Sequence, residues 1–263
     1  MPVALTIAGS DSGGGAGIVA DAATFAAFGV WPTVAVTAVT AQNSGGVHAV
    51  ALVDPDMVKS QIEAVALDIG VDAIKTGMLG SAEIAAAVAS VITALALPRP
   101  VVDPVLVSTS GTRLVADGAL DRLLGLAAVV TPNLGEAAAL TGLVVEDRDG
   151  MVLAARALTD RGCAAALVTG GHLPGEEVAD CLVVAGQEPR WFTAARIPTG
   201  DTHGTGCVLS AAIAARLAQG ASVADACADG IAFVRSAIAN ARRLGRGPGP
   251  VDPTAARARH RQA

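Results

Sequence analysis

The chain has no tyrosine, only two lysines, and no long uninterrupted apolar run. The two lysines are Lys59 and Lys75, and the net charge is −6, which argues against nucleic acid as a main partner. No apolar run reaches the ~20 residues that a membrane-spanning helix needs. Met1-Pro-Val is not followed by a basic n-region or a cleavage pattern, so we expect no signal peptide. These absences argue against a nucleic-acid-binding protein and against a membrane protein.

Cysteine is also scarce, and its four positions, 163, 181, 207 and 227, form no Cys-x-x-Cys motif and no paired framework. Reduced thiols in a cytoplasmic protein are therefore expected. Hydrophobic residues make up 52% of the 263 residues, so a large core of Ala, Val, Leu and Ile is available. No linker rich in Pro, Ser or charge precedes residue 245, which predicts a single domain over residues 1–263 with a frayed tail at 246–263.

Short β-rich runs alternate with longer Ala-rich runs along the chain. Strands are expected at residues 3–9, 33–42, 73–77, 101–105, 129–131 and 165–170, and helices at 15–28, 56–69, 82–95, 120–126 and 150–161. This alternation indicates an α/β fold with a parallel sheet covered on both faces. Residues 178–184 and 190–197 predict a hairpin at one sheet edge, followed by helices at 204–219 and 222–244.

The run Asp201-Thr-His-Gly-Thr-Gly-Cys207 precedes an apolar helical stretch. Unpaired N–H groups and the positive end of the helix dipole make such a helix start a site for phosphate. The same field is expected to lower the pKa of Cys207 and hold it as a thiolate, which could act as a base beside the phosphate site. The simpler interpretation is a helix cap with a buried cysteine.

Glycine also dominates the loop after the first predicted strand, Gly9-Ser-Asp-Ser-Gly-Gly-Gly-Ala-Gly17. Within it, Gly15-Ala-Gly-Ile-Val-Ala20 matches the dinucleotide-binding pattern, but the acidic residue expected about 20 positions later is missing. No P-loop motif occurs in the chain. The loop is better explained as a close approach of backbone to a small substrate, with a plain tight turn as the alternative.

Polar residues recur where predicted strands end, which is where ligands bind in parallel sheets. Gln42 can donate to and accept from a heteroaromatic ring edge, and Asp103 is a plausible carboxylate for Mg²⁺ or its waters. Asn133 and Glu136 fall on one side of a helix start, where capping is the alternative role. Met78 fits core packing equally well.

Several of these motifs occur together and in order: Ala8-Gly-Ser-Asp-Ser-Gly-Gly-Gly-Ala-Gly17 with Ala20-Asp21, Val39-Thr-Ala-Gln-Asn43, Lys75-Thr-Gly-Met78, Val102-Asp-Pro-Val105, Thr131-Pro-Asn133 with Glu136, Gly170-Gly-His172 and Thr202-His-Gly-Thr-Gly-Cys207. The series resembles the hydroxymethylpyrimidine/phosphomethylpyrimidine kinases of thiamine biosynthesis, members of the ribokinase-like superfamily, over roughly residues 3 to 250. The resemblance implies a three-layer αβα fold with a mostly parallel central sheet, commonly a homodimer. It also implies two ATP- and Mg²⁺-dependent phosphorylations, of 4-amino-5-hydroxymethyl-2-methylpyrimidine and then of its monophosphate.

The resemblance also implies roles for individual residues. Cys207 would activate the hydroxymethyl oxygen beside an anion hole formed by Gly204, Thr205 and Gly206. Gln42 would read the pyrimidine edge, and four further residues would line the substrate pocket: Gly9, Asp21, Met78 and Val105. Asp103 and Glu136 would belong to the Mg²⁺ network, and the nucleotide phosphates would lie against Asn133, Thr169, Gly171 and Thr202.

One position departs from the family pattern, which usually has Val-Lys-Gly-Gly-His where this chain has Val168-Thr-Gly-Gly-His172. That lysine is expected to lie against the nucleotide phosphates, so Thr169 leaves a charge missing unless an arginine compensates. Three alternatives stay open. They are a pyridoxal or pyridoxine kinase, a nucleotide-binding regulator without turnover, and a dinucleotide-dependent dehydrogenase.

Overall fold

The computed structural model describes residues 1–106, 118 and 120–260 and is built on one eight-stranded sheet in the order β10-β9-β8-β7-β6-β5-β1-β2. Its strands are β1 (Val3–Ala8), β2 (Trp31–Val36), β5 (Ala73–Thr76), β6 (Val101–Val102), β7 (Val129–Val130), β8 (Ala165–Val168), β9 (Glu177–Val184) and β10 (Arg190–Ala195). Strands β2, β1, β5, β6, β7 and β8 run parallel, whereas β9 is antiparallel to both β8 and β10. The expected edge hairpin is therefore confirmed.

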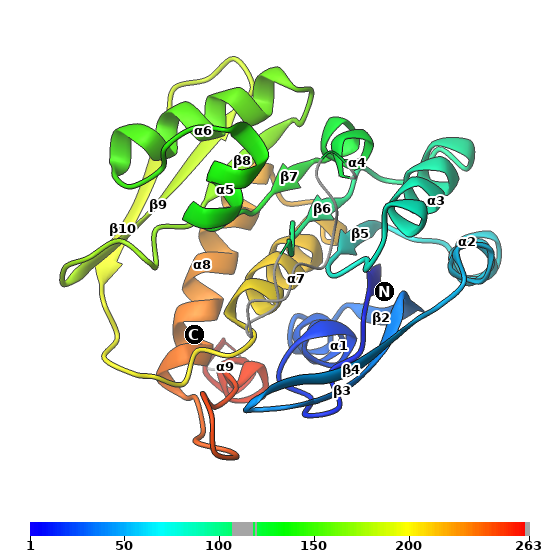
Figure 1. Ribbon diagram of the computed structural model, residues 1–263, viewed down its shortest axis with the longest axis horizontal. Coiled ribbons are helices and arrows are strands. Elements are labelled where there is room, and N and C mark those ends of the chain that lie inside the picture. The colour runs from blue at the N-terminus through cyan, green and yellow to red at the C-terminus, as the bar shows by residue number, and fades with distance from the viewer. Residues whose placement is uncertain (107–117, 119, 261–263) are drawn as a thin grey trace.

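Helices cover both faces of this sheet (Figure 1). One face carries α2 (Pro55–Asp68), α3 (Ala82–Ala94), α4 (Asp121–Leu126), α5 (Leu134–Thr141) and α6 (Arg148–Asp160). The other carries α1 (Gly17–Ala27), α7 (Thr205–Ala218), α8 (Val223–Ala239) and α9 (Pro253–His260). The three-layer αβα architecture is thus confirmed, and none of the helices described is long and apolar enough to cross a membrane.

Alternating strand side chains supply a separate core to each helical layer. Leu5 and Val102 pack with the first layer, whereas Ala4 and Val101 point to the second, as the two-residue period of a strand requires. On the second face, residues 211 to 215 of α7 are all fully buried, and four of these five are alanine. Small side chains let α7 lie close to the sheet and to α8, so aliphatic residues fill a core with few aromatics.

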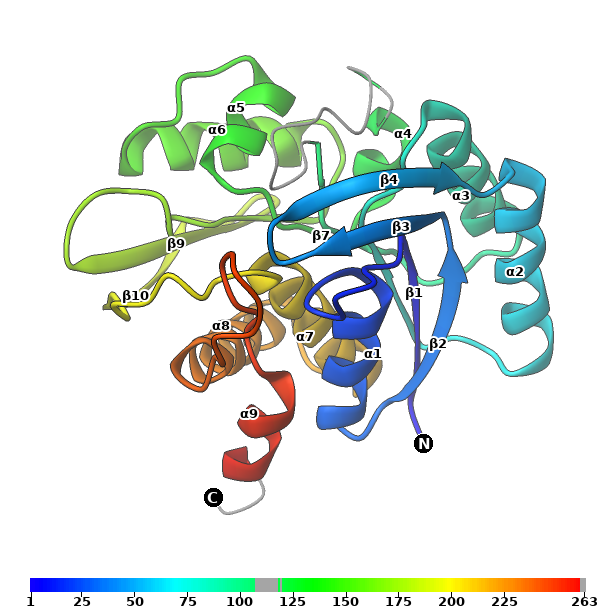
Figure 2. The same ribbon diagram turned by 60° about the horizontal axis from the view of Figure 1, so that its bottom comes forward.

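The single strand expected over residues 33–42 is wrong, because the chain leaves the sheet at Thr37. Residues after that point form β3 (Ala38–Asn43), which pairs with β4 (Gly46–Leu52) in a separate two-stranded sheet that the sequence did not reveal. The Thr37 N–H donates to the Ala8 carbonyl and its hydroxyl donates to the Met78 carbonyl, which fixes the bend. Val and Thr recur on both sides of the break and hid it. Gln42 consequently lies on β3 of this hairpin, which runs beside the sheet (Figure 2).

Much of the tail that was expected to be frayed over residues 246–263 has a defined place in the structure. Helix α8 ends at Ala239, and α9 then begins at Pro253, where Asp252 Oδ1 accepts from the N–H groups of Thr254 and Ala255. Val251 and Ala256 are buried, so this part of the tail packs onto the second helical layer. Residues 261–263 lie outside the described part of the chain.

Candidate active site

The carboxyl ends of the parallel strands open into one cavity of about 1670 Å³. Fourteen of the fifteen predicted site residues line it: Gly9, Gln42, Met78, Asp103, Val105, Asn133, Glu136, Thr169, Gly171, Thr202, Gly204, Thr205, Gly206 and Cys207. The structure thus brings together residues that come from every part of the chain. A smaller cavity of about 230 Å³ beside α4 is lined by none of them.

The start of α7 forms a concave backbone surface within this cavity. Its N-cap, Gly204, has φ = 82° in the left-handed region, where glycine is favoured. A Cβ added at Gly204 would lie 1.9 Å from the Gly15 carbonyl oxygen, so the glycine loop and the helix start touch through backbone. The first N–H groups of a helix have no partner within it, which makes this helix start suited to phosphate.

The glycine loop is held in shape by Asp11, whose carboxylate accepts from the N–H groups of Gly13, Gly15 and Ala16 at 2.8 to 3.1 Å. Asp11 Oδ2 also lies 2.9 Å from His203 Nε2, next to the N-cap of α7. Burial alone would raise the pKa of Asp11, and the bonds to His203 and Gly13 bring the pKa below its ordinary value. Asp11 therefore joins the glycine loop to the anion hole.

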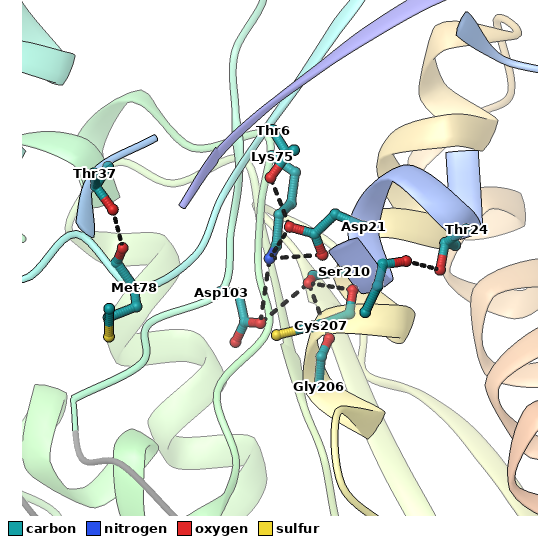
Figure 3. A network of polar contacts seen from close by, with 11 residues as sticks. Thr6, Asp21, Thr24, Thr37, Lys75, Met78, Asp103, Gly206, Cys207 and Ser210 are labelled. Atoms are coloured by element: carbon teal, nitrogen blue, oxygen red, sulfur yellow. Dashed lines mark hydrogen bonds and ion pairs between the residues drawn. The ribbon is translucent and has the colours of Figure 1, made fainter. Parts of the chain in front are cut away.

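Lys75 forms the floor of the cavity and is fully buried (Figure 3). Its Nζ lies 2.8 and 3.0 Å from the two carboxylate oxygens of Asp21 and 3.9 Å from Asp103 Oδ2. Burial by itself lowers the pKa of Lys75, and the negative charges around it, Asp21 first, more than offset this and raise it. The geometry is that of a buried ion pair, and the Thr6 hydroxyl donates a further bond to Asp21 at 2.6 Å.

The structure places Asp21 behind the cavity wall. Asp21 is 0% exposed and is not among the residues that line the cavity, because its carboxylate faces Lys75 from within α1. A charge as well buried as that of Lys75 needs a partner of opposite sign. Asp21 supplies this partner.

The expected low pKa of Cys207 is also wrong. Burial raises the pKa of this thiol to about 12, although Lys75 acts in the opposite direction. The carboxylates of Asp103 and Asp21 add to the increase, and the Gly17 N–H at the sulfur lowers it. Burial of the thiol, with a smaller contribution from the two carboxylates, thus keeps the pKa of Cys207 high at the helix start. Cys207 is nevertheless the one partly exposed thiol, because Cys163, Cys181 and Cys227 are buried.

Two carboxylates face the same part of the cavity. Glu136 forms a capping box with Asn133, in which each side chain accepts from the other's backbone N–H at 2.9 Å. Burial and the nearby charge of Asp103 raise the pKa of Glu136 to about 8. No group of three or more metal-ligating side chains occurs in the described residues. Two carboxylates still fit Mg²⁺, which is usually held by one or two carboxylates together with water and substrate phosphates.

The end of the cavity nearest β3 is defined by the hairpin and the glycine loop. Gln42 and Met78 line it, and Gly9 donates from its N–H to the Met78 carbonyl at 3.1 Å. A Cβ added at Gly9 would lie 2.4 Å from Met78 Cε, so the Met78 side chain packs directly against the glycine backbone. Ser10 and Thr40 exchange backbone and hydroxyl bonds of 2.8 to 3.0 Å, which join the loop to β3. We call this region the substrate end.

The opposite end lies between β8, the β9–β10 hairpin and α8, and we call it the nucleotide end. Thr169 lines this end and donates from its N–H to the Pro132 carbonyl at 2.9 Å. Its side chain ends in a neutral hydroxyl, so it adds no charge to the cavity. Two arginines line this end. Arg196 donates to three carbonyls, of Gly171, Leu173 and Gly175, whereas Arg235 donates to the Ala195 carbonyl. Apolar residues complete the lining: Ile197, Pro198, Leu209, Ala228, Ile231, Ala232 and Ile238.

Sequence reasoning gave no role to four residues that the structure places in or beside the site. They are Asp11, Lys75, His203 and Arg235. Lys75 carries a usable signal, since it is one of two lysines and lies inside an otherwise apolar strand. Asp11 and His203 also stand beside glycine motifs, but nothing in the sequence shows that they meet across 192 positions.

A parallel sheet that places an anion-binding helix start, a pair of carboxylates and a thiol in one cavity is the arrangement of a ribokinase-like small-molecule kinase. The family model for phosphomethylpyrimidine kinase matches residues 11–252 of this chain. The chain therefore belongs to the phosphomethylpyrimidine kinase family, and membership removes the dehydrogenase alternative.

Individual relatives agree with this assignment. A hydroxymethylpyrimidine/phosphomethylpyrimidine kinase of Mycobacterium tuberculosis is 49% identical over 257 residues, covering 96% of this chain and 94% of the relative. A thiamine biosynthesis bifunctional protein ThiED of Geobacter sulfurreducens is 44% identical over 252 residues, covering 94% of this chain and 51% of that protein. Among solved structures, an ADP complex of Bacillus subtilis pyridoxal kinase superposes with a TM-score of 0.90 at 37% identity, covering 98% of this chain and 99% of that one.

Proposed function

We propose that this protein transfers the γ-phosphoryl group of ATP to the hydroxymethyl oxygen of 4-amino-5-hydroxymethyl-2-methylpyrimidine, and then phosphorylates the monophosphate to the diphosphate, in thiamine biosynthesis. The strongest support is one cavity with Gln42 at one end, arginines at the other, and the α7 helix start with Cys207 between them. Such an order suits an alcohol and a nucleotide that meet at the anion hole. The relatives' names support the same substrates.

In this proposal the anion hole of residues 204–206 holds the transferring phosphoryl group through backbone N–H groups. Most of the rate acceleration in enzymatic phosphoryl transfer comes from positioning and charge stabilisation of this kind. Gln42 orients the pyrimidine by donating to a ring nitrogen and accepting from its amino group. The hydroxymethyl oxygen then faces Cys207, which takes up the alcohol proton.

Cys207 can accept that proton only as a thiolate, and two neighbours oppose each other in setting its charge. The Lys75 ammonium favours the thiolate, whereas Asp103 disfavours it. Asp103 and Glu136 would hold Mg²⁺, which would supply positive charge that offsets both carboxylates. The Lys75 ammonium is held in place by Asp21, so it stays close to Cys207.

Thr169 replaces a family lysine that is expected to contact the nucleotide phosphates, so another residue would have to supply that positive charge. Arg196 is committed to three backbone carbonyls, so it shapes the 171–175 loop. Arg235 lines the cavity from α8 and lies close enough to Asp180 to lower the pKa of that buried carboxyl, against the larger effect of burial. Of the two arginines, Arg235 is therefore our candidate for the compensating charge.

Pyridoxal or pyridoxine phosphorylation is the second candidate, favoured by the TM-score of 0.90 to a pyridoxal kinase. Both substrates are heteroaromatic rings with a hydroxymethyl group, and the cavity has room for either. The 49% identity to a hydroxymethylpyrimidine/phosphomethylpyrimidine kinase exceeds the 37% identity to the pyridoxal kinase, which favours the pyrimidine.

The decisive assay gives the purified protein Mg-ATP with hydroxymethylpyrimidine, pyridoxal or pyridoxine, and follows products by mass spectrometry. We expect pyrimidine mono- and diphosphate, with a higher kcat/KM than for either B6 vitamer. A higher kcat/KM for a B6 vitamer would establish the alternative. ATP binding without turnover of any alcohol would instead establish a nucleotide-binding regulator. A Cys207→Ala protein purified in parallel controls for contaminating kinases.

We also propose a cytoplasmic homodimer. The β3–β4 hairpin exposes Val39, Val50 and Leu52 at 57, 43 and 49%, and a second copy would cover these apolar side chains. The four cysteines are free thiols, as a reducing compartment favours. Sedimentation analysis tests the dimer, and Val50→Glu together with Leu52→Glu should shift it toward monomer.

A further inference from the structure

Residues 245–251, which follow α8, contact two parts of the site that are distant in sequence. The N–H groups of Arg246 and Gly247 both donate to Ser44 Oγ, at 3.1 and 3.2 Å, in the turn of the β3–β4 hairpin. Figures 1 and 2 show this segment beside that turn. One segment near the end of the chain thus reaches the hairpin that carries Gln42.

The same segment is joined to the loop before α7. The Gly249 N–H donates to Asp201 Oδ1 at 2.7 Å, and the Gly249 carbonyl accepts from the His203 N–H at 3.1 Å. The Val251 N–H in turn donates to the His203 carbonyl at 3.1 Å. Because His203 directly precedes the N-cap of α7, residues 245–251 link the hairpin turn to the anion hole.

Close backbone contact explains why this segment contains so much glycine. A Cβ added at Gly247 would lie 1.9 Å from the Ser44 carbonyl oxygen. At Gly245, which has φ = 82°, an added Cβ would lie 2.1 Å from Ser44 Oγ. Contacts this short leave no room for a side chain, so the glycines are needed for the segment to seat against the turn.

The segment is anchored at its far end. The Asp252 N–H donates to the Ala237 carbonyl at 3.1 Å, and its carboxylate lies 3.2 Å from Arg242 Nε. Val251 is 4% exposed and packs into the second core. A segment fixed to α8 in this way can restrain a hairpin whose two strands pair only with each other among the strands described.

We propose that residues 245–251 form a clasp that positions the β3–β4 hairpin, and with it Gln42, relative to the anion hole. Ser44 is the positioning residue through which the clasp acts, since it lies in the hairpin turn, two residues after Gln42 of β3. The inference rests on the proposed function in assigning Gln42 to the alcohol substrate. Loosening the clasp at Ser44 should therefore weaken binding of the alcohol and leave binding of ATP unchanged, because the contact with Ser44 lies at the hairpin turn and the bonds of Gly249 and Val251 to His203 beside the anion hole are kept.

Two variants test the clasp from opposite sides of the contact. Gly247→Ala places a methyl group against the Ser44 carbonyl, and Ser44→Ala removes the shared acceptor without adding bulk. We expect the KM for hydroxymethylpyrimidine to rise about tenfold and about threefold respectively, as loss of one or two hydrogen bonds allows. The KM for ATP should stay within about twofold of wild type, a split that general destabilisation would not give.

Matched controls are Gly125→Ala, where the nearest atom to the new methyl group is 3.8 Å away, and Ser60→Ala on α2. Both should leave the two KM values unchanged. An unchanged alcohol KM in both clasp variants, or an equal rise in the KM for ATP, would overturn the proposal.

Hydrogen exchange without substrate separates the clasp from the proposed function. Amides of residues 43–47 should exchange faster in Gly247→Ala and Ser44→Ala than in wild type, while those of β1 and β5 stay protected. This holds even for a protein that phosphorylates no alcohol, in which case the proposed function fails and the clasp stands. Unchanged exchange at 43–47 in both variants would overturn the clasp itself.

Discussion

At the substrate end of the cavity, segments far apart in the sequence are tied together by backbone and side-chain hydrogen bonds, whereas the nucleotide end is lined largely by apolar side chains and two arginines. Asp11, Thr40 and Ser44 each join two loops at the substrate end. At the nucleotide end, Thr169 stands where the family has a charge. Changes at the first end should alter substrate selection, and changes at the second should alter the charge available to phosphate.

Removing the thiol that lies between the two ends should have the largest effect. Cys207→Ala is expected to lower kcat by ~10²–10⁴, the range for loss of a positioned general base. The fold should survive because the residue is partly exposed to the cavity. Steady-state kinetics and thermal unfolding measure the two quantities. Cys163→Ala is the control that removes a thiol outside the cavity, and a wild-type kcat in Cys207→Ala would refute the role.

Breaking the ion pair under the cavity should chiefly cost stability. Asp21→Asn leaves the buried Lys75 ammonium without its partner, so the free energy of unfolding should fall by ~3–5 kcal/mol. Urea unfolding measures this loss. The double variant Asp21→Asn with Lys75→Met removes both charges and should recover part of it. A loss below about 1 kcal/mol in the single variant would contradict the assignment of Asp21 as a structural partner.

The substrate end can be probed at Gln42. Gln42→Leu keeps the approximate size but leaves the ring groups of the pyrimidine unpaired, which should weaken its binding by ~1–3 kcal/mol. Calorimetry should show this loss while ATP affinity persists. Gln187→Leu, in the exposed turn between β9 and β10, is the matched control. Unchanged pyrimidine affinity in Gln42→Leu would show that the ring is bound elsewhere.

The raised pKa of Cys207 predicts how the alkylation rate of this thiol depends on pH. With a thiol pKa of about 12, the thiolate fraction is small near neutral pH and grows as pH rises. Alkylation of Cys207 by iodoacetamide should therefore accelerate about tenfold for each pH unit without levelling off near neutrality. Cys207 should still react before the buried Cys163, Cys181 and Cys227. A plateau in the alkylation rate near neutral pH would show that the pKa of Cys207 is low, as the helix start alone predicts.

The smallest expected effect concerns the nucleotide end. Thr169→Lys should lower the KM for ATP and raise kcat, each by roughly two- to fivefold, as one added ion pair in a partly solvated site allows. The salt dependence of ATP binding should also become steeper. Thr159→Lys adds the same charge on α6, away from the cavity. No gain, or a loss in both constants, would indicate that Arg235 already supplies the charge.

Local patterns were sufficient for much of the fold. Apolar runs bounded by glycine predicted β1, β5 and β8 to within two residues at each end, because a buried parallel strand needs such a run. The hairpin of β3 and β4 could not be found this way. Val and Thr recur on both sides of Thr37, and the bend there is fixed by the carbonyls of Ala8 in β1 and of Met78 after β5.

The candidate site likewise contains residues that local patterns identify and residues whose role depends on distant neighbours. Gly204, Cys207, Asp103 and Asn133 carry recognisable motifs, since a tight turn, a helix cap and a strand end each require particular residue types. Two further properties depend on surroundings that no local pattern shows. Asp21 faces a buried lysine, and the pKa of Cys207 rises chiefly because the thiol is buried, with a smaller increase from Asp103 and Asp21.

The amino-acid sequence by itself determined the three-layer architecture, the glycine loop, the helix start and the family, because each depends on residue types at short, fixed spacings. Only the tertiary structure decided which charges face one another. Lys75 meets Asp21 across 54 positions, and His203 meets Asp11 across 192. Electrostatic energies depend on distance and burial in space, so spacing along the chain does not determine the ionisation of Cys207 or the pairing of Lys75.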